Sequence, residues 1–293
     1  MSEKEKKPRK TNEETKEIVK KLVIMDDAMF EVMCEDPYFV EEMLQIIMEN
    51  KKLRIKYDSV VAQKSIKSLT GRSVRLDAYV EGCEDYVFNI EIQKADNCNH
   101  IKRVRYNASM ITVANSEPGD EFEHVQNLCV IYISNFDMFG KGLTTYHVRD
   151  TILETGDVVE NGLSEIYVNA EVHDKTDISR LMELFTKRQL DTKDSDLFPY
   201  TYRMFDKIKN SEEGVKHMCE KIESYAKKYA KEYAKEYAEE YAKEYAEEQV
   251  ISYAIGKYAE SGMDKDAIVT QIMQEFSLTK EKAEEFCANV LRK

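Results

Sequence analysis

The fold is decided by two short segments joined by a glycine-containing connector, VRLDAYV (74–80) and VFNIEIQK (87–94). Apolar and polar residues alternate in both segments, and this period of two is typical of β-strands that bury one face. The expected buried face comprises Val74, Leu76, Ala78 and Val80, followed by Phe88, Ile90 and Ile92. The connector EGCED (81–85) predicts an antiparallel hairpin with one buried face and one polar, solvent-facing side.

Helical periodicity flanks the hairpin. We expect helices over 13–25, 27–33, 37–50, 99–114 and 178–190. Asp27 is expected to cap the second helix, and Pro37 suits the first turn of the third. In the fourth helix, the predicted buried stripe consists of Ile101, Val104, Ala108 and Ile111.

Three strands are expected after this helix. The nearly continuous apolar run LCVIYISNF (128–136) predicts a strand that is buried on both faces. Further strand-like runs cover 144–153 and 164–172. Because helices, hairpin, helix and buried strand follow one another in this order, the sequence predicts an α/β fold.

The chain divides into four predicted parts. Residues 1–12 are expected to be a disordered basic arm, and residues 13–220 an α/β domain. A long helix is expected over 221–262, followed by a small helical module over 263–293.

A four-residue repeat runs from 225 to 248, YAKKYAKEYAKEYAEEYAKEYAEE. It contains neither Gly nor Pro, so we expect one uninterrupted helix of about 36 Å. A period of four overshoots the helical turn, so the Tyr-Ala stripe winds around the helix by about 40° per repeat and forms no conventional heptad seam. The repeat is either a solvated spacer or a helix for partner docking or for self-association into a homo-oligomer, a coiled coil included.

Composition narrows the class of protein. The chain has 293 residues and a formal charge of −13, which argues against indiscriminate coating of DNA but leaves room for a local basic surface. The apolar share of 42% excludes wholesale disorder. The first ten residues lack an apolar core, no run has the length of a membrane span, and the six cysteines are scattered, so we expect a cytoplasmic protein with no membrane partner.

One polar constellation in the hairpin can carry chemistry. Glu91 and Gln93 are two residues apart on a strand and project from the same face. If the hairpin pairs symmetrically about Glu84, Asp77 falls opposite Glu91. Hard cations such as Mg²⁺, with Mn²⁺ as a substitute, prefer such oxygen ligands, and a cation held there could activate water and stabilise charge on a phosphodiester. The alternative interpretation is structural: any half-exposed hairpin has acidic residues on its solvent-facing side, with no role in metal binding.

Basic segments bracket this constellation. Residues 51–75 contain eight basic residues and one acid, and residues 94–116 contain four basic residues and one acid. Basic groups beside paired carboxylates are what a metal-dependent phosphodiesterase needs, although a basic run is also compatible with a solvated loop. The histidines show no metal-binding spacing, FGKG (139–142) lacks the P-loop pattern, and no nucleophile elbow is present.

Several segments together resemble a known family. SLTGRSVRLDAYVE (68–81) and YVFNIEIQKADNCNHIKRVRYNASMI (86–111) resemble the core of the recombination-promoting nuclease/transposase family, which belongs to the PD-(D/E)xK nuclease superfamily. DDAMFEVMCED, VIYISNFDMFGKGLTTYHV and ENGLSEIYVNAE extend the resemblance to roughly residues 20–190. It implies a restriction-endonuclease-like core, a mixed sheet flanked by helices, within residues 13–220.

The resemblance also implies roles for individual residues. Asp77 and Glu91 would bind the metal, and Gln93 would complete the catalytic set where most of the superfamily has Lys. A glutamine carries no charge, but it could orient the attacking water by hydrogen bonding. Residues expected to contact the substrate are Arg75, Lys94, Arg103, Arg105 and Tyr106. An acid on the N-terminal helix of the family, which DDAMFEVMCED resembles, often joins such sites, with Asp27 as the first candidate and Glu31 as the next.

Two functions follow from these observations. The first is a Mg²⁺-dependent endonuclease that hydrolyses DNA phosphodiester bonds. The alternative is a catalytically degenerate nuclease fold that acts as an interaction or assembly factor through its C-terminal helix.

Overall fold

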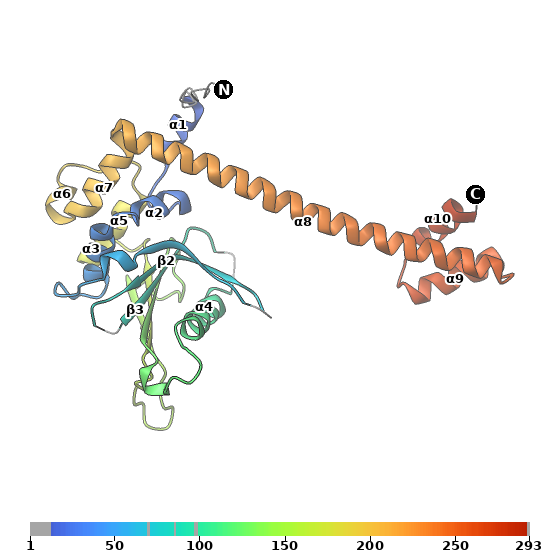
Figure 1. Ribbon diagram of the computed structural model, residues 1–293, viewed down its shortest axis with the longest axis horizontal. Helices are drawn as coiled ribbons and strands as arrows, with labels where there is room; N and C mark the ends of the chain where they lie inside the picture. Colours follow the sequence, from blue (N-terminus) through green and yellow to red (C-terminus); the bar gives the residue numbers. More distant parts are fainter. Residues whose placement is uncertain (1–12, 69–70, 85, 97–98, 292–293) are drawn as a thin grey trace, which may run out of the picture. The chain divides into compact units, whose positions relative to one another are not determined.

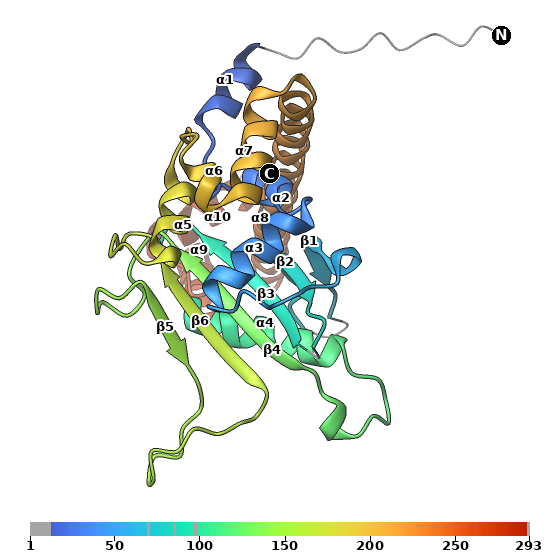
Figure 2. The same cartoon turned by 90° about the vertical axis from the view of Figure 1, so that its left-hand side faces the viewer.

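The computed structural model describes residues 13–68, 71–84, 86–96 and 99–291, so the predicted arm at 1–12 lies outside the described residues. The described strands form one mixed sheet in the order β1-β2-β3-β4-β6-β5 (Figure 2). Their bounds are β1 Val61–Ile66, β2 Val74–Glu81, β3 Tyr86–Gln93, β4 Asn127–Ser134, β5 Thr145–Val148 and β6 Leu163–Asn169. The central strands β3, β4 and β6 are parallel, and the outer neighbours pair antiparallel.

Helices cover both faces of this sheet (Figure 1). Their bounds are α1 Glu13–Lys21, α2 Asp27–Met33, α3 Pro37–Ile47, α4 His100–Ala114, α5 Asp177–Thr186, α6 Asp194–Leu197 and α7 Pro199–Asn210. Two short 3₁₀ turns lie at Tyr57–Ser59 and Phe122–His124. Helix α4 packs against one face through Val104, Ala108 and Ile111, and the other helical layer packs against the opposite face. The predicted α/β class with a mixed sheet and flanking helices is confirmed.

The larger core lies beneath α2, α3, α5 and α7. Phe30, Phe39 and Phe185 come from three of these helices, and their ring centroids are 6.3–6.4 Å apart. All three side chains are fully buried. Strand β4 is buried along nearly its whole length between the two helical layers, as its continuous apolar run predicts.

The hairpin exists, but the predicted alternation in its first strand is wrong. Val74 and Leu76 pack under α4, whereas Ala78 and Val80 pack into the opposite core. The apolar side chains of β2 therefore point to one side of the sheet before Asp77 and to the other side after it. The neighbouring strand does the same beside it, at Gln63, whose φ of 54° departs from extended backbone. A regular period of two cannot anticipate such a local reversal.

Three further expectations need correction. Helix α1 ends at Lys21 instead of Met25. Strand β1 lies within the basic run that is compatible with a solvated loop. Ile101 was expected in the buried stripe of α4 but is 50% exposed, because the buried positions include His100 and Asn107 instead.

The described residues separate into two compact units, with the boundary between Glu223 and Ser224. Helix α8, Glu212–Glu260, includes the whole Tyr-Ala repeat and crosses this boundary. In the second unit, α9 (Lys265–Glu275) and α10 (Lys280–Leu291) pack with the end of α8 around a small core of Ile251, Ile255, Ile268, Val269, Ile272, Ala283 and Cys287. Within the described residues, no helix combines the length and the apolar character needed to span a membrane.

Candidate nuclease site

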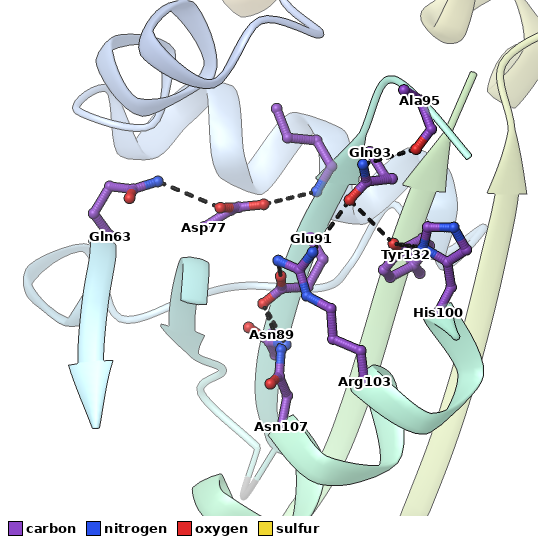
Figure 3. Close-up of polar contacts among 11 residues, drawn as sticks. Gln63, Asp77, Asn89, Glu91, Gln93, Ala95, His100, Arg103, Asn107 and Tyr132 are labelled. Carbon is purple, nitrogen blue, oxygen red and sulfur yellow. Dashed lines mark hydrogen bonds and ion pairs between the residues drawn. The ribbon is translucent and has the colours of Figure 1, made fainter. Parts of the chain in front are cut away.

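The two candidate acids lie opposite each other on the central hairpin. The pairing of β2 with β3 runs from Glu81–Val87 to Ala78–Ile90, and Asp77 and Glu91 are the next residues on the two strands. This is the symmetric pairing about Glu84 that the sequence suggests. Figure 3 shows both carboxylates on neighbouring strands, with Gln93 farther along β3 and α4 beside them.

Glu91 is fully buried, although it was expected on a wet face. Helix α4 covers it, and its exposed fraction is 0%. Its Oε1 accepts hydrogen bonds from the amide nitrogens of Asn89 (3.1 Å) and Asn107 (3.2 Å), while Nη2 of Arg103 lies 3.2 Å from Oε2. Burial raises the pKa of Glu91, and the charge of Asp77 raises it further, against the opposing effect of Arg103.

Asp77 is held between two strands. Its Oδ2 accepts from the backbone N–H of Ile92 at 3.0 Å, and its Oδ1 accepts from Nε2 of Gln63 at 3.4 Å. Burial raises the pKa of Asp77 more than the bond from Ile92 lowers it, and the negative charge of Asp27 adds to the rise. Two carboxyl groups with raised pKa values thus face each other, which is typical of functional sites.

Gln93 is fixed at both ends of its amide. Its Nε2 donates to the carbonyl of Ala95 at 2.9 Å, and its Oε1 accepts from Nη1 of Arg103 at 3.1 Å. The hydroxyl of Tyr132 also approaches Oε1, at 3.5 Å, and bonds to Nδ1 of buried His100 at 2.7 Å. Gln93 therefore belongs to a packed polar network that links β3, β4 and α4 (Figure 3).

The predicted substrate contacts divide into one that joins the acids and four that do not. Arg103 bonds to both Glu91 and Gln93. Lys94 points away and pairs with Asp26 at 2.6 Å, as strand alternation predicts. Tyr106 donates to the backbone carbonyl of Arg72 at 2.7 Å. Arg75 on β2 is half-buried, and Arg105 on α4 is exposed.

The candidate acids on the helices separate in the same way. Asp26, not Asp27, holds the N-cap position of α2, so the capping role expected for Asp27 is wrong. Asp27 begins the helix, and its charge acts on Asp77. Glu31 pairs with Lys221 at 2.7 Å. Asp27 is thus the helical acid whose charge reaches the hairpin pair.

Three amides at the site were missed by sequence reasoning. Gln63 and Asn107 lie on β1 and α4, at distances along the chain that no motif spans. Asn89 had a weak signal, because it shares the polar face of Glu91 and Gln93. Among the described residues, Gln63 Oε1 and Asn89 Oδ1 are buried without a hydrogen-bond partner. Two orphaned oxygens therefore accompany the two carboxylates.

These oxygens fit a hard divalent cation. No group of three or more His, Cys, Asp or Glu side chains within the described residues is arranged to hold a metal ion. The donor set is instead two carboxylates and nearby amide oxygens, without nitrogen or sulfur. Mg²⁺ is commonly bound through one or two carboxylates, with water and substrate phosphate as its remaining ligands, so Asp77 and Glu91 would hold it.

Comparison with known proteins identifies the family of the chain. Residues 35–254 match the model of the PD-(D/E)XK nuclease family transposases. The chain belongs to this family. The match covers the sheet, the hairpin acids and most of α8, so it extends farther toward the C-terminus than the resemblance at roughly 20–190. A search of curated proteins finds no match.

Membership of the PD-(D/E)XK family accounts for the architecture. The mixed sheet with helices on both faces is the restriction-endonuclease-like α/β fold. The family suggests nuclease activity and a DNA substrate, and PD-(D/E)XK nucleases typically use divalent metals.

Proposed function

We propose that the protein is a divalent-metal-dependent endonuclease that hydrolyses DNA phosphodiester bonds, with Asp77 and Glu91 as its metal-binding acids and Gln93 beside them as the third residue of the site. The observation that carries this proposal is the pair of neighbouring carboxylates, Glu91 buried and Asp77 half-buried, beside two orphaned amide oxygens. Burying two like charges together costs free energy. An ion that both carboxylates bind would offset that cost.

The residues of the chain would divide the chemistry among them. Asp77 and Glu91 would hold Mg²⁺, or Mn²⁺ in its place, which supplies charge neutralisation at the phosphate and a water of lowered pKa. The backbone N–H of Ile92 and the amide of Asn107 keep the two carboxylates oriented. Since Glu91 is buried and Asp77 largely so, the carboxylates act in a region of low dielectric, where their interaction with a cation is strong.

Basic residues surround the hairpin on the β1 side. Strand β1 pairs with β2, so part of the basic segment 51–75 runs directly beside Asp77. Lys67 and Arg72 are exposed there, and Lys64 lies 3.0 Å from the ring centroid of Tyr79. Such groups can bind the DNA backbone without reading its sequence. The net acidity of the chain would limit this binding to the surroundings of the site.

Cleavage of supercoiled plasmid tests the proposal. We expect nicked and linear products with Mg²⁺ or Mn²⁺ and none with EDTA. Asp77→Asn should slow cleavage roughly 10²-fold or more, because it removes one of the two negative charges that would bind the cation. Asp58→Asn, at a 3₁₀ turn away from the site, is the matched control and should cleave like the parent. Equal cleavage by Asp77→Asn and parent would exclude this site.

The C-terminal parts motivate a second candidate function. We propose that residues 13–220 carry the activity, and that the helix over 221–262 and the module over 263–293 mediate assembly, including homo-oligomers. In support, the second unit has its own apolar core, and Val250 and Tyr253 are largely exposed on α8. If the nuclease site is inactive, assembly through these C-terminal parts would be the function of the protein.

Light scattering can test assembly. The full chain is expected to show a larger mass per particle than one monomer, and a chain shortened after Glu223 is expected to be monomeric. The shortened chain retains the core that surrounds the hairpin. If both chains have the same oligomeric state, the C-terminal parts do not drive self-association.

A further inference from the structure

The amide of Gln93 is poorly placed to act on a water molecule. One N–H of its Nε2 bonds to the carbonyl of Ala95 at 2.9 Å. Its acceptor faces Arg103 at 3.1 Å and the Tyr132 hydroxyl at 3.5 Å. The bonds that this side chain makes within the structure therefore go to the protein, and its oxygen holds the guanidinium of Arg103.

Arg103 is a cation in direct contact with buried Glu91. Its Nη1 bonds to Gln93 and its Nη2 to Glu91, so two of its five N–H donors fix the plane of the guanidinium. The side chain of Arg103 is 43% exposed, whereas that of Glu91 is 1% exposed. Arg103 therefore connects the buried acids to the solvent-facing side, and its remaining donors can meet a ligand there.

We infer that Arg103 supplies the positive charge of this site by binding a phosphate of the DNA strand, and that Gln93 is the residue that positions it. The inference rests on the proposed nuclease function. Most of the superfamily has a Lys on this strand. Here the positive charge would be that of Arg103 on α4, and the strand has the neutral Gln93, which holds Arg103 in place.

The chemistry favours arginine in this place. Phosphodiester hydrolysis increases negative charge on the phosphate oxygens, and a preoriented donor stabilises that charge more than a mobile one. A guanidinium binds phosphate through two parallel hydrogen bonds. Val104 and Ala108 anchor α4 in the core, so the backbone that carries Arg103 is well supported.

A charge exchange between strand and helix tests this inference. Arg103→Ala should lower kcat about 10²-fold, as removal of one donor to a developing charge does elsewhere. Gln93→Lys in the Arg103→Ala background should recover at least about tenfold of that loss, because the charge returns from the strand. Gln93→Lys alone should slow the parent, because it places an ammonium group against Arg103.

Lys102→Ala is the matched control. Lys102 is exposed in the same helical turn, and among the described residues it is Arg103, not Lys102, that bonds to Gln93 and Glu91. Loss of Lys102 therefore removes equal charge without disturbing the pair. Its kcat should stay near that of the parent. If Arg103→Ala and Lys102→Ala show the same kcat, or if Gln93→Lys restores nothing, the inference is wrong.

DNA affinity in EDTA separates this inference from the proposed function. A phosphate contact contributes to the slope of log K against log salt, so Arg103→Ala should flatten that slope by about 0.9 and Lys102→Ala should leave it unchanged. Arg103→Lys keeps the charge and should keep the slope, which provides a folded comparison if the alanine variant is unstable. Absent cleavage by the parent would refute the nuclease, whereas an unaltered slope in Arg103→Ala would refute the phosphate contact.

Discussion

Glu91→Gln is expected to abolish cleavage and, in the same protein, to raise the melting temperature of the metal-free form. Activity should fall roughly 10³-fold or more, because the buried carboxylate is the principal anionic ligand offered to the cation. Stability should move in the other direction, because a neutral amide of the same shape relieves the cost of a buried charge. Glutamine Oε1 can still accept from Asn89 and Asn107, and Arg103 can turn toward solvent.

The stabilisation should depend on pH. Burial raises the pKa of Glu91 above its ordinary value of 4.5, so the unfolded chain loses this proton first as pH rises. Below about pH 4.5 the carboxyl is protonated in both states and contributes no difference. Above pH 4.5, the carboxyl of residue 91 ionises in the unfolded chain but stays protonated in the folded protein, which favours unfolding. This effect grows with pH until Glu91 also ionises in the folded protein. The stability of the metal-free parent should therefore fall relative to Glu91→Gln from about pH 4.5 through neutral pH.

Thermal melts in EDTA at several pH values measure this difference. Each kcal/mol relieved should shift the melting temperature by about 2–4 °C for a domain of this size. Mg²⁺ should stabilise the parent increasingly as pH rises, since the ion binds the ionised form, and should leave Glu91→Gln unaffected. Glu81→Gln, on the same hairpin but partly exposed and paired with Lys56, is the matched control and should show neither effect. A Glu91→Gln protein that retains cleavage, or that is less stable than the parent at neutral pH, would contradict the buried-ligand assignment.

Glu42→Ala is expected to cause a large loss of stability at a position outside the site. Glu42 is buried on α3, and its carboxylate accepts from the backbone N–H groups of Tyr200 (3.1 Å) and Thr201 (2.8 Å). The hydroxyl of Thr201 donates to it as well, at 2.7 Å. These bonds satisfy the N-terminus of α7, which has no side-chain cap of its own. Alanine would leave buried donors without a partner, at a cost of about 3 kcal/mol.

Urea or thermal unfolding measures the effect. In thermal unfolding, the melting temperature of Glu42→Ala is expected to lie about 6–12 °C below that of the parent, since each kcal/mol shifts it by about 2–4 °C in domains of this size. Thr201→Val removes one donor and leaves the backbone bonds, so it should cost about 1 kcal/mol. Cleavage below the melting temperature should persist in both variants, because Glu42 lies in the other helical layer from α4. Similar stabilities of Glu42→Ala and parent would show that the cap contributes little.

The hairpin illustrates how far local sequence reaches. Its register follows from a short connector and two alternating runs, and that register alone places Asp77 opposite Glu91. The buried strand β4 is equally visible, because a strand covered on both faces needs a continuous apolar run. These features depend on neighbours a few residues apart along the chain.

The amide side chains around the two acids could not be predicted from local sequence. Gln63 enters through the pairing of β1 with β2, and Asn107 through the packing of α4 over β3. The exchange of faces at Asp77 has no signature in the spacing of apolar residues. Each of these contacts depends on which segments pack together in three dimensions.

The amino-acid sequence by itself determined the α/β class, the antiparallel hairpin and its register, because pleat and turn act locally. It also predicts Asp77, Glu91 and Gln93 as the candidate site. Only the tertiary structure decided that Glu91 is buried, that both carboxyl pKa values are raised, and that Arg103 lies between Glu91 and Gln93. The physical reason is that desolvation and charge pairing depend on what covers a residue. Here the cover is α4, which folds back over the strand from which it follows.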